Sequence, residues 1–273
     1  MLGPWRFDAL AVAAAILAVA AYVAGLVRLR RLGRPPWRIM RTLWFVSGIT
    51  IGLLAIESPL DAAGDRAFAP HMLQHLILTS IAAPLVLCGA PLLLLLCAAP
   101  TRDARRVVVW LRGPIGHALA LPPLTWSVFI ATLWLTHFTG LFEAALEHES
   151  IHVLEHALYF GTALLFWFPI IAIGPTPWST RAFAYPLRMA YLLLAMPAQA
   201  ALGFAIYTDR HVLYAHYAAR GLEDQQIAGE LMWVGGSLLA IVPFLLVGAA
   251  WGRSEERAAR RADAFATAPQ SSS

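Results

Sequence analysis

Residues 72–97 read MLQHLILTSIAAPLVLCGAPLLLLLC, and Asp, Glu, Lys and Arg are all missing from this stretch. A helix of this length rises about 39 Å, which exceeds the roughly 30 Å hydrocarbon core of a bilayer. Uncharged apolar stretches this long are typical of transmembrane helices. The stretch therefore predicts a membrane span rather than the core helix of a soluble domain.

The same pattern recurs along the chain. Of its 273 residues, 59% are hydrophobic and 13% are charged, and that charged fraction is about half of the value usual for soluble domains. Apolar stretches lie at about 9–27, 40–56, 72–97, 119–138, 151–173, 186–206 and 229–251. The sequence predicts an all-α polytopic membrane protein, a bundle of about seven transmembrane helices.

Prolines and cysteines inside the spans lead to two further expectations. Pro84, Pro91 and Pro197 interrupt apolar stretches, and proline removes a helical hydrogen bond, so kinks are expected there. Cys88 and Cys97 share one apolar segment, which predicts buried thiols rather than an exposed disulfide.

The arginines predict how the chain is oriented in the membrane. Six, four, two and four arginines lie in the alternate connections 28–41, 102–112, 181–188 and 253–261, whereas the intervening connections carry only Arg66, Arg210 and Arg220. Under the positive-inside rule, the N-terminus is outside and the C-terminus is cytoplasmic. We expect residues 1–252 to form one transmembrane domain and 253–273 to be a disordered cytoplasmic tail. Because the arginines are spread between apolar runs, nucleic-acid binding is not expected.

The nine histidines are distributed unevenly, since all but His117 fall at the outer ends of spans or in outer connections. His71 and His75 have the i, i+4 spacing that places both imidazoles on one helix face. His148, His152 and His156 repeat this spacing in the fifth span.

His137, at the outer end of the fourth span, faces that second stripe. A lone interfacial histidine is more often a polar anchor, but two such pairs on different spans favour metal ligands. Imidazole suits copper, zinc, iron and nickel. The sequence therefore predicts a transition-metal site formed by His71, His75, His137, His152 and His156.

Other side chains are candidates for additional ligands or for groups that orient the ligands. A methionine offers soft sulfur to reduced copper, and carboxylates attract cations or hold imidazoles in place. The residues of this second group are His148, His211, His216, Met72, Glu57, Asp61, Glu155 and Glu230.

Several motifs are similar to those of a known family. They are SPLD at 58–61, PHMLQH at 70–75, APL at 83–85 with GAP at 89–91, the histidine stripe at 148–156 with WFP at 167–169, and AGELMW at 228–233. With these motifs the chain resembles the seven-helix CtaG-type cytochrome c oxidase assembly factors of bacteria, which are associated with caa-type oxidases. The resemblance covers nearly the whole chain.

The resemblance implies a non-enzymatic metallochaperone in the bacterial plasma membrane that helps a copper ion to reach a haem-copper oxidase. The implied partners are the apo form of the cytochrome c oxidase subunits, the lipid bilayer, and a periplasmic or extracellular copper donor.

Three alternatives remain open from the residues. Three histidines could hold zinc in an intramembrane hydrolase that activates a water molecule for attack on a lipid amide. His75 and His156 could be the axial ligands of a haem. The histidines could also organise an interface with a partner subunit without binding metal.

Overall fold

The computed structural model describes residues 5, 7–171, 173 and 183–266, and every regular element in these ranges is a helix. The first half of the chain contains α1 (Ala9–Arg31), α2 (Ile39–Glu57), α3 (Pro59–Gly64), α4 (Phe68–Ile77), a π-helical turn (Leu78–Ala82), α5 (Ala83–Cys88), α6 (Pro91–Ala98), α7 (Thr101–Arg112) and α8 (Pro114–Leu119). The second half contains α9 (Pro122–Phe138), α10 (Leu141–Glu147), α11 (Glu149–Ile171), α12 (Tyr185–Thr208), a 3₁₀ turn (Ala215–Arg220), α13 (Gly221–Glu230), a second π-helical turn (Leu231–Gly235) and α14 (Gly236–Ala266).

Within the described ranges, six helical segments are long and apolar enough to cross a membrane: Ala9–Arg31, Ile39–Gly64, Phe68–Ala98, Glu149–Ile171, Tyr185–Thr208 and Ala215–Asp263. The pair α9 and α10 adds a seventh span if it is counted as one, but its two parts are bent by 68°. The all-helical membrane architecture agrees with the sequence. The fourth predicted span corresponds to α9, which passes as a span only together with the bent helix α10.

The third span is irregular where its two prolines lie. The π-helical turn Leu78–Ala82 immediately precedes the short helix that carries Pro84. At the second break Ala90, the residue before Pro91, has a left-handed conformation (φ 53°), which ends the right-handed helix there. The indole of Trp167 donates a hydrogen bond of 2.7 Å to the carbonyl of Thr79, a group inside the widened turn. Pro197, by contrast, lies within the continuous helix α12.

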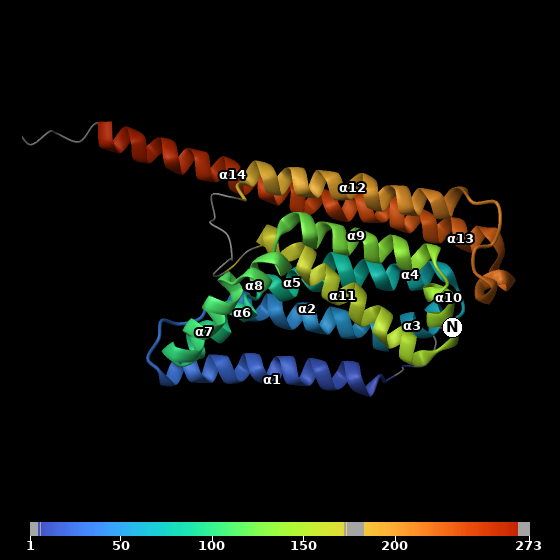
Figure 1. Cartoon of the computed structure of the whole chain (residues 1–273), viewed down its shortest axis with the longest axis horizontal. Helices are drawn as coiled ribbons and strands as arrows, with labels where there is room; N and C mark the ends of the chain where they lie inside the picture. The colour runs from blue at the N-terminus through green and yellow to red at the C-terminus, as the bar shows by residue number, and fades with distance from the viewer. Residues whose placement is uncertain (1–4, 6, 172, 174–182, 267–273) are drawn as a thin grey trace, which may run out of the picture.

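The helices form a layered bundle in which α1 lies at one edge and α12 and α14 lie at the other, with α4, α9 and α11 between them (Figure 1). The arginine-rich connection between α1 and α2, helix α7 and the C-terminal extension of α14 lie at one end of this bundle (Figure 1). Helices α3 and α10 lie at the opposite end, together with the start of α4. The arginine-rich connections that the structure describes are thus at the opposite end from the histidines other than His117, as the sequence predicts.

Two details differ from the sequence-based expectations. Helix α14 continues to Ala266, so residues 253–266 are helical rather than disordered; residues 267–273 lie outside the described residues. Cys97 is exposed on the bundle surface and Cys88 is half-buried, so the prediction of a buried thiol is wrong for Cys97. Cys97 lies near the end of the apolar span Phe68–Ala98, where contact with lipid rather than with other helices would keep the thiol out of water.

Candidate metal centre

Helix α4 is fixed in place at its N-terminus and along one face. The Asp224 carboxylate, from α13, accepts hydrogen bonds from the backbone N–H groups of Phe68 (2.6 Å) and Ala69 (3.3 Å), which have no partner within the helix. The Gln74 side chain donates to the carbonyl of Ala55 (2.9 Å) and to the Asp61 carboxylate (3.0 Å). These contacts set the depth and the rotation of the helix that carries two of the histidines.

The two histidines of α4 meet a carboxylate of α11. The Nε2 atoms of His71 and His75 are 3.1 Å apart. The Glu155 carboxylate lies 3.7 Å from the first of these atoms and 4.0 Å from the second. All three side chains are buried. One ligand atom from each lies within 4.8 Å of the others, an arrangement that could hold a metal ion.

A second group of three possible metal ligands shares His71 with the first group. One ring nitrogen of each of His71, His152 and His156 lies within 4.8 Å of the other two. The His152 and His156 rings are 4.3 Å apart between centroids, and the His71 ring is 5.3 Å from that of His152. The i, i+4 pairs of α4 and α11 therefore face each other across the bundle.

Several polar atoms of this cluster are buried without a hydrogen-bond partner among the described residues. They are Nδ1 of His75, Nε2 of His152, Nε2 of His156 and both carboxylate oxygens of Glu155. An unpaired buried polar atom costs roughly 1–3 kcal/mol. A cation coordinated by these atoms would remove that cost, so the donor set fits a transition-metal ion.

Two tyrosines that the sequence analysis missed hold the imidazoles. Tyr159 stacks on the His75 ring at 4.1 Å between centroids, and its hydroxyl is 3.1 Å from Nδ1 of His137. The Tyr217 hydroxyl is 3.2 Å from Nδ1 of His71 and donates to the carbonyl of Gly64. Tyr159 follows His156 by three residues, a spacing that places it on the same face of α11; no local pattern indicates Tyr217.

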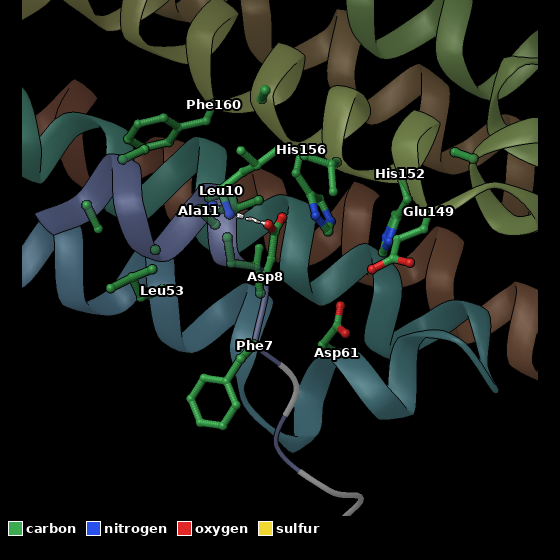
Figure 2. A pocket seen from close by; sticks show the side chains of 18 of the residues that line it. Phe7, Asp8, Leu10, Ala11, Leu53, Asp61, Glu149, His152, His156 and Phe160 are labelled. Atoms are coloured by element: carbon green, nitrogen blue, oxygen red, sulfur yellow. Dashed lines mark hydrogen bonds between the residues drawn. The ribbon is translucent and has the colours of Figure 1, made fainter. Parts of the chain in front are cut away.

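A cavity of about 960 Å³ lies beside the cluster, between α1, α2 and α11. His152 and His156 point into it from α11, with Asp61 on the opposite side (Figure 2). Its polar lining also includes Asp65, Glu149 and His216. The walls formed by α1 and α2 are mostly alanine, glycine, leucine and isoleucine. The cavity therefore connects two of the imidazoles with a group of carboxylates.

Three of the remaining candidate ligands, His148, His211 and Glu230, are exposed. His148 is exposed and extended before α11 begins, so it does not continue the stripe of His152 and His156. His211 is exposed beside Asp209. Glu230 is exposed at the end of α13.

Two other candidates make hydrogen bonds near the ends of helices. Glu57 is buried and accepts a hydrogen bond from the backbone N–H of Asp8 (2.9 Å). His216 is exposed and lines the cavity, with its Nε2 atom 2.8 Å from the carbonyl of Asp65. Neither belongs to the two groups of three.

The chain is similar to proteins of three mycobacteria. Curated relatives include uncharacterized proteins of Mycobacterium bovis and Mycobacterium tuberculosis, each 28% identical over 97% of this chain, and one of Mycobacterium leprae, 28% identical over 96%. The chain spans only 42%, 42% and 41% of the length of these relatives. No solved structure matches it significantly.

A family model matches residues 20–254, which include all the helices that contribute to the histidine cluster. That model describes the cytochrome c oxidase caa3 assembly factors. The resemblance inferred from the motifs is thereby confirmed, and the chain belongs to the cytochrome c oxidase caa3 assembly factor family.

Proposed function

We propose that this protein binds a copper ion at the histidine cluster of α4, α9 and α11 and assists its delivery to the haem-copper oxidase. The observation that carries the proposal is the convergence of His71, His75, His152, His156 and Glu155 in the bundle interior, with unpartnered nitrogens on three of the imidazoles. Imidazole donors suit copper and zinc rather than calcium or magnesium. Membership of an oxidase assembly family favours copper, which a haem-copper oxidase requires.

The cavity supplies an entry route for the cargo ion. Carboxylates at one side of a cavity raise the local concentration of cations, and Asp61, Asp65 and Glu149 line this one. Of the clustered imidazoles, those of His152 and His156 line the cavity, whereas that of His71 does not. An ion can then pass inward by exchanging one ligand at a time. Such an open site suits a protein that delivers its metal, whereas a closed structural site would retain the ion.

The expected orientation of the bundle in the membrane indicates from which side the ion would be loaded. The arginine-rich end faces the cytoplasm of a bacterial cell under the positive-inside rule, which places the cluster near the outer face of the plasma membrane. A periplasmic or extracellular donor would then load the protein, and the apo form of an oxidase subunit would receive the ion within the bilayer.

The test is the metal content of detergent-purified protein after exposure to copper under reducing conditions, with zinc measured in parallel. The test variant carries His71→Ala, His75→Ala, His152→Ala and His156→Ala. The matched control carries His148→Ala and His211→Ala, two exposed histidines outside the cluster. We expect copper in the wild type and in the control, and its loss from the folded test variant. Absence of copper from the wild type, or its retention by the test variant, contradicts the proposal.

A zinc-dependent hydrolase is a second candidate, because the apolar walls of the cavity would suit a lipid chain beside His152 and His156. Zinc held by three histidines would activate a water molecule there. Zinc as the sole bound metal, with release of fatty acid from a lipid amide, would favour this reading. A haem between His75 and His156 is disfavoured by packing, since His71 and Tyr159 are in ring contact with His75.

A further inference from the structure

His137 and Met72 form a buried pair that the cavity does not reach. The Nε2 atom of His137 lies 3.2 Å from the sulfur of Met72. The two residues are 3% and 0% exposed, and neither lines the cavity. They come from α9 and α4, so the contact joins two spans.

The contacts of His137 favour one ring nitrogen as the carrier of the proton. Its Nδ1 atom lies 2.8 Å from the backbone carbonyl of Leu133. A carbonyl oxygen only accepts hydrogen bonds, so we assign the ring proton to Nδ1, which donates it. The hydroxyls of Tyr159 and Thr136, 3.1 and 3.3 Å from Nδ1, are compatible with this assignment because a hydroxyl oxygen also accepts. In the neutral ring the other nitrogen, Nε2, then bears a lone pair. The same arrangement, with Nδ1–H held by a backbone carbonyl, orients metal-binding histidines.

The lone pair of Nε2 therefore faces a thioether sulfur, which is also an acceptor. Two acceptors at 3.2 Å without a proton between them have no attraction of their own. A soft cation between them would be attracted to both. Zinc bonds of about 2.0 Å to nitrogen and about 2.3 Å to sulfur show that one transition-metal ion can reach two atoms at this separation.

A third donor lies close to the pair. The His75 ring is 6.2 Å from the His137 ring between centroids. Its Nδ1 atom has no hydrogen-bond partner in the part of the chain that the structure describes. His75 follows Met72 by three residues, so both side chains lie on one face of α4.

We propose that Met72 and His137, together with His75, form a second and more deeply buried site that takes copper in its reduced state, Cu(I). The inference rests on the proposed function, because the ion would arrive from the cavity through the cluster. Thioether sulfur selects Cu(I), whereas the imidazoles and carboxylate of the first site suit harder ions as well. The structure thus separates a site of entry from a site of retention.

The test is X-ray absorption spectroscopy of the full-length protein loaded with Cu(I), combined with competition against a chromophoric Cu(I) chelator. We expect a sulfur scatterer at about 2.3 Å in the wild type. Met72→Leu, which keeps the side chain apolar and of similar size, should remove that scatterer and weaken Cu(I) binding at least tenfold. Met232→Leu is the control, because Met232 is also buried but lies outside the cluster. Zinc binding should be unchanged in both variants.

The possible results separate this inference from the proposed function. If the wild type binds copper with nitrogen and oxygen scatterers only, the Met72 site is wrong and the histidine site stands. If Met72→Leu keeps the sulfur scatterer, the assigned sulfur is wrong. If the wild type binds no copper, both proposals fail.

Discussion

The carboxylate of Asp224 accepts a hydrogen bond of 2.6 Å from the backbone N–H of Phe68, a residue 156 positions earlier in the chain. This contact ties the start of α13 to the start of α4, one turn before His71. The last span thereby helps to set the position of the helix that carries the first pair of histidines.

Asp224→Ala should lower the free energy of unfolding by roughly 1–2 kcal/mol, because the first N–H groups of α4 lose their acceptor. The measurement is unfolding in mixed micelles, followed by circular dichroism. Glu223→Ala removes an exposed carboxylate from the same turn of α13 and serves as the control. Equal stability of the two variants would show that this contact does not anchor α4.

Glu155→Gln should weaken copper binding by about 10- to 100-fold while the protein remains folded, since it replaces the only carboxylate in the two groups of three ligands by a neutral amide. Competition with a chelator of known affinity measures the change. Glu147→Gln alters an exposed carboxylate and should have no effect. An unchanged affinity in Glu155→Gln would mean that this carboxylate does not support the bound ion.

Glu149→Gln should slow the association of copper by about two- to tenfold and weaken its dependence on ionic strength, with little change in affinity. Glu149 lines the cavity beside His152, where a carboxylate attracts cations without belonging to the buried groups. Stopped-flow mixing at several salt concentrations gives both quantities, and Glu147→Gln is again the control. Identical rates in the two variants would place the entry route elsewhere.

Gly203→Ala should destabilise the protein by about 1–3 kcal/mol through overpacking. A methyl group at Gly203 would lie 2.5 Å from the backbone nitrogen of Trp233 and 2.7 Å from the carbonyl oxygen of Gly229. Gly161→Ala is the matched control, because its methyl group would meet no heavy atom within 4 Å. The difference between the unfolding midpoints of the two variants in mixed micelles measures the loss of stability. Similar midpoints would show that α12 can move away from the last span to accommodate the methyl group.

The sequence by itself determined the membrane class, the helices and the separation of arginines from histidines. These properties depend on local composition and on the hydrogen bonds that a helix makes within itself. The i, i+4 spacing also placed His71 with His75 and His152 with His156 before any contact was known. It misplaced His148, because α11 begins only at Glu149 and the residue before it is extended.

Only the tertiary structure decided which side chains meet between helices. Three contacts depend on the depth and rotation of each helix: the approach of Glu155 to both His71 and His75, the contact of His137 with Met72, and the contact of Tyr217 with His71. Those are set by distant contacts such as Asp224 with Phe68, and by the widened turn before Pro84. Spacing along one helix defines a face, but the packing of several helices determines what that face contacts.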